Sequence, residues 1–243
     1  MAGVAAVTAG KVDGEGRSAP RLAPEAASDS GVTETVWVAA LIPGDPLMTS
    51  ARRLQDALAS AGLSVAHALP PVVPVAALSS ISGSAAVPAV TSVLATLHGG
   101  CVADDLAVQT ALRTDALRAG ALRGSVSRVV LPLANPTLLE AITHHVESLT
   151  ASQAASGVAA AALGRADGLL LAPGAPSQET SRAVRHAPTR ADDGVLASRR
   201  WQAAVLCVEY SAYRGATSWA WQLLGSRKLR RWWNAPGDAV RAP

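Results

Sequence analysis

Phenylalanine is absent from this chain of 243 residues, and tryptophan and tyrosine together bring the aromatic share to only 3%. Lysine is almost absent too, since Lys11 and Lys228 are the only lysines among 21 basic residues. The apolar residues make up 49% of the chain and are mainly Ala, Val and Leu. A core of such small side chains needs close approach between its elements. The net charge of +3 permits an anionic partner but does not require one.

Cysteine is scarce, and the two residues present, Cys101 and Cys207, follow no metal-ligand spacing. A disulfide framework is therefore not expected, and we expect an intracellular protein of a reducing compartment, either cytoplasmic or mitochondrial. Residues 1–30 lack the continuous apolar segment of a secretory signal. Residues 57–103 contain no Asp, Glu, Lys or Arg, but prolines and serines interrupt this run. We therefore expect buried elements here and no membrane span.

Composition divides the chain into three parts. Residues 1–32 are rich in Ala, Gly, Pro and Ser and show no apolar period, so a disordered leader is predicted. Residues 33–225 carry the regular apolar patterns and are predicted to form the folded domain. Residues 226–243 form a basic tail that contains tryptophan.

The domain opens with a strand followed by a helix. The strand is predicted at residues 35–43, and Asp45 is expected to cap the helix, with Pro46 in its first position. Gly62 is expected to end the helix. Three- and four-residue spacings predict its buried stripe, which comprises Leu47, Ala51, Leu54, Leu58 and Ala61.

Further strands, helices and a closing hairpin are predicted from the same patterns. The predicted strands lie at residues 63–67, 72–81, 126–133 and 168–172. One helix is predicted at residues 84–97, and Asn135-Pro136 opens another. The stripe of that second helix comprises Leu138, Ile142, His145 or Val146, and Leu149. Residues 174–199 are predicted to be a long loop, and residues 201–210 and 218–224 a hairpin. This order favours an α+β fold of antiparallel sheets with helices packed on one side.

Three stretches resemble a known family. These are Val36 to Pro43 with the capped helix, Arg128 to Leu149, and the hairpin from Trp201 to Leu224. Their order is similar to that of the 2H phosphoesterases, especially the RNA 2′,3′-cyclic phosphodiesterases once called 2′-5′ RNA ligases. The resemblance covers about residues 35–225 and rests on apolar pattern and spacing. It implies two lobes of antiparallel sheet, with helices on the outside, that face each other across a groove.

Each lobe of that family carries a His-x-Thr or His-x-Ser motif. One histidine acts as general base and the other as general acid, while the hydroxyls hold the phosphate. By element order the first motif falls near Val75 and Ala76, and the second at Gly168 and Leu170. Both places keep an apolar strand but lack the imidazole and the hydroxyl. None of the five histidines has Ser or Thr two residues later, so the sequence predicts a domain without this catalysis.

Arginine and tryptophan provide the candidate contacts to RNA. Guanidinium groups bind phosphate bidentately, cations attract the nucleic-acid backbone, and aromatic faces stack on bases. The simpler interpretation is a mobile basic loop and a tail whose tryptophans pack back on the domain. The candidate residues are Arg182, Arg185, His186, Arg190, Arg227, Lys228, Arg230, Arg231 and Trp232.

The remaining polar clusters have structural explanations. His144 can pair with Glu140 on a solvent-facing helix surface, and His145 lies at the edge of the predicted core stripe. His98 and Cys101, with the nearby Asp104 and Asp105, provide too few N and S ligands for zinc. We expect no metal and no cofactor.

Three functions follow from these patterns. The first is an inactive 2H-like domain that binds RNA or serves as a structural subunit of an assembly. The second is an active RNA 2′,3′-cyclic phosphodiesterase with displaced catalytic residues. The third is an unrelated protein–protein interaction module. RNA and other proteins are thus the candidate partners, and a membrane is not.

Overall fold

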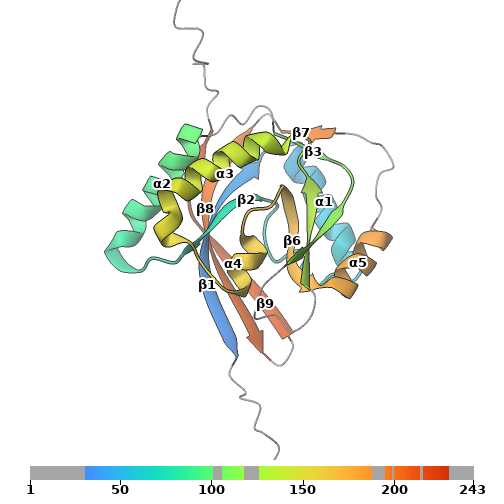
Figure 1. The fold of residues 1–243 in the computed structure, drawn as a ribbon. Coiled ribbons are helices and arrows are strands. Elements are labelled where there is room, and N and C mark those ends of the chain that lie inside the picture. The colour runs from blue at the N-terminus through green and yellow to red at the C-terminus, as the bar shows by residue number, and fades with distance from the viewer. Residues whose placement is uncertain are drawn as a thin grey trace, which may run out of the picture. The chain divides into compact units, whose positions relative to one another are not determined.

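The protein folds into antiparallel sheets with helices, as a computed structural model shows for residues 31–100, 106–117, 126–187, 195–198, 200–213 and 216–229 (Figure 1). The predicted α+β class is therefore confirmed. The leader up to residue 30 and the tail from residue 230 lie outside the described residues. Within the described ranges, each helix falls short of the length or apolar character needed to cross a membrane.

Nine strands and five helices occur among the described residues, together with two short 3₁₀ turns at Gly83–Ala85 and Ala151–Gln153. In chain order they are β1 (Val32–Pro43), α1 (Leu47–Ser60), β2 (Val73–Ser79), α2 (Ala86–Gly100), β3 (Ala107–Gln109), β4 (Arg113–Leu117), β5 (Val126–Pro132), α3 (Pro136–Thr150), α4 (Val158–Leu163), β6 (Gly168–Pro176), α5 (Ser177–His186), β7 (Val195–Ala197), β8 (Trp201–Tyr213) and β9 (Ala216–Lys228).

The strands form a four-stranded sheet in the order β2-β1-β8-β9, a three-stranded sheet in the order β4-β5-β6, and a small β3-β7 ladder. All neighbouring strands are antiparallel. The predicted closing hairpin is β8–β9, and β9 continues to Lys228 rather than ending at Leu224. Arg227 and Lys228 therefore lie at the end of an edge strand, opposite Ala203 and Gln202.

The two larger sheets meet where β2 adjoins β6. The amide of Leu170 donates to the carbonyl of Val72 over 2.7 Å, and the reverse bond measures 3.4 Å. The amide of Ala166 donates to the carbonyl of Pro74 over 3.4 Å. Strands that are far apart in the sequence are thereby held side by side.

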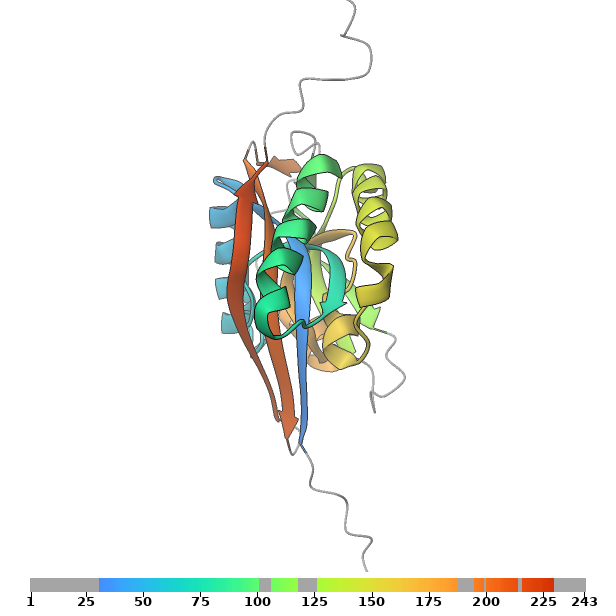
Figure 2. The ribbon, with the colours of Figure 1, turned by 90° about the vertical axis from the view of Figure 1, so that its left-hand side faces the viewer.

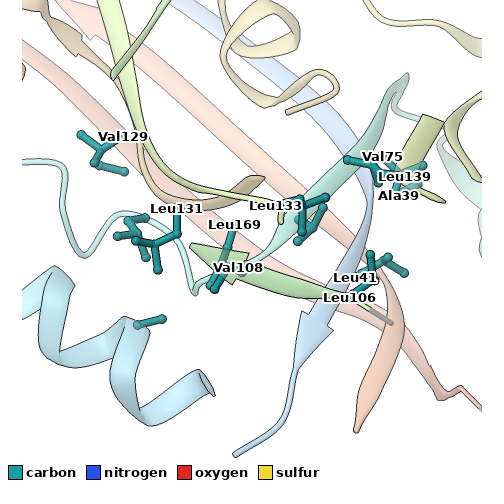
Figure 3. Packing of buried hydrophobic residues seen from close by; sticks show 14 of the residues in the cluster. Ala39, Leu41, Val75, Leu106, Val108, Val129, Leu131, Leu133, Leu139 and Leu169 are labelled. Atoms are coloured by element: carbon teal, nitrogen blue, oxygen red, sulfur yellow. The ribbon is translucent and has the colours of Figure 1, made fainter. Parts of the chain in front are cut away.

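Alternate residues of β1 enter two different cores, as the period of a strand requires. Trp37, Ala39 and Leu41 belong to the larger cluster, which also contains the buried faces of α1, α2 and α3 (Figure 3). Val36, Val38 and Ala40 belong to a smaller cluster. That cluster also takes in Val130 and Leu170 of the three-stranded sheet and the alanines of α4, so it lies between the two sheets.

Helix α4 lies between the two sheets (Figure 1). A charged side chain from each sheet holds one of its ends. The carboxylate of Glu34 on β1 accepts hydrogen bonds from the amides of Val158 and Ala159, at 3.1 and 2.7 Å. At the other end, the Arg128 guanidinium on β5 donates to three carbonyls. Those carbonyls belong to Ala162, Gly164 and Arg165, at 3.4, 3.0 and 2.8 Å. An anion at the start and a cation at the end of a helix both satisfy unpaired backbone groups and complement the helix dipole.

Two predictions made for loops and short strands are wrong. Residues 63–67 form hydrogen-bonded turns instead of a strand, and the amide and hydroxyl of Ser64 are tied to Glu179 of α5. Residues 174–199 are not one loop, because α5 and β7 lie within them. The buried residues of α5 are only Thr180 and Ala183, so its sequence shows almost no apolar stripe. Its acid in the first turn and bases in the last turn suit a helix.

The helix ends agree with the sequence in part. The Asn135 side chain accepts from the amide of Thr137 over 3.2 Å, as predicted for the cap of α3. Asp45 does not cap α1, because the helix begins one residue later than expected and Asp45 accepts from the Thr49 hydroxyl instead. Leu149, predicted to be buried, is 59% exposed.

Glu34→Ala should destabilise the fold, because it removes the acceptor for two amides at the start of α4. We expect the free energy of unfolding to fall by about 1 kcal/mol, as for the loss of a helix cap. Urea denaturation followed by tryptophan fluorescence measures it. The control is Glu209→Ala, an exposed carboxylate on β8, which should cost less than about 0.5 kcal/mol. An equal loss in both variants would show that the contact with α4 contributes nothing.

Candidate functional site

The four positions singled out on β2 and β6 are buried and aliphatic or glycine. Val75 is 0% exposed and Leu170 only 1% exposed, and Ala76 and Gly168 are buried as well. The side chain of Leu170 lies in the cluster between the sheets, whereas Val75 belongs to the larger core (Figure 3). No group that could transfer a proton stands at these positions, and their side chains do not face one common space.

The five histidines lie on three helices and one turn, and none of them stands on β2 or β6, where the motif imidazoles are missing. His67 follows α1, His98 lies on α2, His144 and His145 are exposed on α3, and His186 ends α5. Within the part of the chain that the structure describes, no group of three His, Cys, Asp or Glu side chains could hold a metal ion. The proposed partners of His98, namely Cys101, Asp104 and Asp105, lie outside the described residues.

Cys207 on β8 is a free thiol that is unsuited to nucleophilic chemistry. Burial, together with the nearby carboxylate of Glu209, raises the pKa of this thiol above its ordinary value. The thiol is therefore largely protonated near neutral pH, and the thiolate is the reactive form.

A first hollow, of about 360 Å³, lies beside β2, α3 and α4. Its walls are mainly alanine, including Ala76 and Ala77, with Glu147, Thr150 and Arg165 as the larger polar residues. Arg165 pairs with Glu140 and Asp167 at 3.2 and 3.3 Å, and the Thr150 hydroxyl donates to a helix carbonyl. Most of the polar groups here already have partners, so the hollow offers a ligand little beyond apolar contact.

A second hollow, of about 280 Å³, is lined by residues of α1, of the turn after it and of the edge strand β9. Both α1 and β9 are seen at the left of the ribbon in Figure 2. Trp221 of β9 forms one wall and is 45% exposed. The other residues belong to α1 and the turn that follows it; four are charged or polar and three are apolar. They are Arg52, Gln55, Asp56, His67, Leu69, Pro70 and Pro71.

Gln55 is held in this second hollow by two hydrogen bonds of its side chain. It is only 3% exposed, and its Nε2 donates to the carbonyls of Leu69 and Leu171, at 2.9 and 2.8 Å. Both amide protons are thus used, which leaves Oε1 to accept a hydrogen bond. Beside it, Asp56 Oδ1 lies 3.4 Å from His67 Nε2. The wall formed by α1 therefore offers acceptors at Gln55 Oε1 and Asp56, beside the guanidinium donors of Arg52.

The basic residues of the described chain fall into two classes. Arg113, Arg128 and Arg165 each pair with a carboxylate within 4 Å. Seven others form no ion pair with any acid in the described ranges. These are Arg52, Arg53, Arg182, Arg185, Arg200, Arg227 and Lys228.

Several of these unpaired cations gather around α1. Arg182, Arg185 and His186 are exposed on α5, and the Arg182 guanidinium would lie 3.6 Å from a Cβ placed on Gly62, at the end of α1. Arg52 lies midway along α1 and lines the second hollow. Arg227 and Lys228 are exposed at the far end of β9. Arg190, Arg230, Arg231 and Trp232 lie outside the described residues.

Sequence patterns did not identify Arg52 or Trp221 as site residues. Arg52 fell on the polar face of a well-formed amphipathic helix, and Trp221 fell within a predicted strand. An aromatic residue in a strand is usually buried, so nothing local distinguishes Trp221 from a core residue. Its exposure depends on the position of β9 at the edge of the sheet.

Comparison with protein-family models and with curated proteins finds no match to this chain.

Leu170→Ala tests whether this position is packed core. We expect it to lower the free energy of unfolding by about 2–5 kcal/mol, as for other buried leucines, because the cavity cannot collapse fully. Chemical denaturation provides the measurement. Leu223→Ala makes the same truncation on the exposed side of β9 and should cost less than about 0.5 kcal/mol. If the two variants lose the same stability, Leu170 does not lie in a packed interior.

Proposed function

We propose that this chain is a 2H phosphoesterase-like domain that has lost its phosphodiesterase chemistry and binds RNA. The order of strands and helices supports this proposal, as do the two antiparallel sheets that meet at β2 and β6. These are the two strands on which the resemblance locates the histidine motifs. In this interpretation each sheet, with its outer helices, corresponds to one lobe of the family.

The loss of chemistry follows from the side chains at the motif positions. General acid–base catalysis requires groups that titrate within reach of the scissile phosphate. Val75, Ala76, Gly168 and Leu170 cannot transfer protons, and α4 fills the space between the sheets with alanine and leucine. Glu34 and Arg128 hold the two ends of α4. A phosphate bound between the sheets would therefore have to displace this helix.

Affinity for RNA is supported by cations that form no ion pair with an acid of the described residues. Lys and Arg side chains bind nucleic acids largely by neutralising phosphates and releasing counterions. Arg182 and Arg185 project from α5, and Arg227 and Lys228 from the end of β9. This single observation carries the proposal, because paired arginines such as Arg113 and Arg165 would lose their carboxylates on binding phosphate.

We predict that the full chain leaves an RNA that ends in a 2′,3′-cyclic phosphate intact. The reason is that no acid–base pair stands at the motif positions. Chromatography of the RNA after prolonged incubation with excess protein measures the conversion. Turnover that is lost in His145→Ala or His186→Ala would instead identify an active phosphodiesterase with displaced catalytic residues.

The double variant Arg182→Gln/Arg185→Gln should weaken binding of single-stranded RNA and make it less sensitive to salt. The slope of log affinity against log salt should lose roughly 0.7 for each phosphate contact removed. Fluorescence anisotropy at several salt concentrations measures both effects. Arg165→Gln is the matched control, since this arginine already pairs with Glu140 and Asp167. Unchanged binding in the double variant would overturn the role given to α5.

A further inference from the structure

Two tryptophans lie on the same face of β9, but only one is engaged with the fold. Trp219 and Trp221 are two residues apart, so their side chains share a face. The Trp219 ring contacts that of Tyr210, with centroids 4.7 Å apart, and packs against both cores. Trp221 stands opposite Val208 of β8, and no strand of the described residues pairs with the outer edge of β9. Its ring is left partly open to solvent as one wall of the second hollow.

The opposite wall suits the edge of a planar, neutral group. Asp56 lies there beside Gln55, and a carboxylate would repel a phosphate that entered the hollow. The carboxylate and the Gln55 Oε1 both accept hydrogen bonds, because the Gln55 amide protons are already used. Arg52 lies on the same helix, also lines the hollow and has no acidic partner in the described ranges, so its guanidinium can hold the phosphate attached to a base that occupies the hollow.

The volume limits what can enter. At about 280 Å³ the hollow is near the lower end of small-ligand pockets, which span roughly 300–1,000 Å³. It therefore suits one ring system better than a longer molecule. Proteins hold an unstacked base of single-stranded RNA with three kinds of group: an aromatic face that stacks on the base, hydrogen-bonding groups at the edge of the base, and cations at the neighbouring phosphates.

We infer that the hollow between α1 and β9 binds one unpaired nucleobase of single-stranded RNA, stacked on Trp221. This inference rests on the proposed function, because the unpaired cations of α5 and β9 would hold the strand to which the base belongs. The acceptors of Gln55 and Asp56 select bases that carry an exocyclic amino group. Cytosine, with its amino donor, is preferred to uracil, which presents a carbonyl at the same place.

The test compares short oligo(C) and oligo(U) of equal length, with inorganic polyphosphate as an anion without bases. Trp221→Ala is expected to weaken oligo(C) binding about tenfold, within the range of base–aromatic stacking. Trp221→Phe should keep most of the affinity, because it keeps a stacking face. Polyphosphate binding should not change in either variant, which also shows that both variants are folded.

Matched controls separate the pocket from the general surface. Leu223→Ala truncates an exposed residue of the same strand that does not line the hollow, and it should leave oligo(C) binding intact. Arg52→Gln should weaken oligo(C) more than Arg53→Gln, which removes the same charge from a neighbouring residue of α1 that does not line the hollow. Asp56→Asn should reduce the preference for oligo(C) over oligo(U).

The outcomes distinguish this inference from the proposed function. If Trp221→Ala binds oligo(C) like the unaltered chain while Arg182→Gln/Arg185→Gln binds it more weakly, the base pocket is overturned and RNA binding stands. An equal loss with Leu223→Ala also overturns the pocket. If the unaltered chain binds oligo(C), oligo(U) and polyphosphate equally well, the hollow does not recognise a base and the inference is overturned. If it binds neither oligonucleotide, the inference and the proposed function fall together.

Discussion

The arrangement of the two sheets depends on how α4 is held between them. This helix has only six residues, too few to be stable by itself. Glu34 from the four-stranded sheet and Arg128 from the three-stranded sheet satisfy its two ends. Burial lowers the pKa of Arg128, while the nearby Asp115 opposes that shift, and the ordinary value is so high that the guanidinium stays charged. The same contacts therefore fix the helix and bring one charge from each sheet to it.

Small side chains make this arrangement possible. Ala159, Ala160 and Ala162 are buried against β1, β2 and β6, where larger residues would push the sheets apart. Gly157 precedes the helix with φ of 110°, and a Cβ there would lie 2.6 Å from the Glu34 carboxylate. A chain without phenylalanine thus gains its packing from close approach of backbone elements. The space between the sheets is thereby occupied by apolar side chains, and the motif positions Val75, Ala76, Gly168 and Leu170 carry no titratable group.

The groups that we propose to bind RNA lie instead on the outer elements α1, α5 and β9. Their cations have no carboxylate partners in the described ranges, and Trp221 lacks a neighbouring strand to cover it. Exposure of an edge strand is usually limited by charge or by a covering element. In β9 the charges of Arg227 and Lys228 lie at one end, and the hollow against α1 lies nearer the middle. The fold therefore separates a packed interior from a polar surface available to a ligand.

Most strands, the helices α1, α2 and α3 and the absence of a histidine motif could be predicted from the sequence, because these depend on local periodicity and residue identity. Helix α5 could not, because its two buried residues, Thr180 and Ala183, give almost no apolar signal. The contact of Leu170 with α4 and the position of Trp221 against α1 follow from the fold, since both join segments far apart in the chain. Whether an arginine is paired or free depends on which carboxylate the fold brings within reach, and spacing along the chain carries no such information.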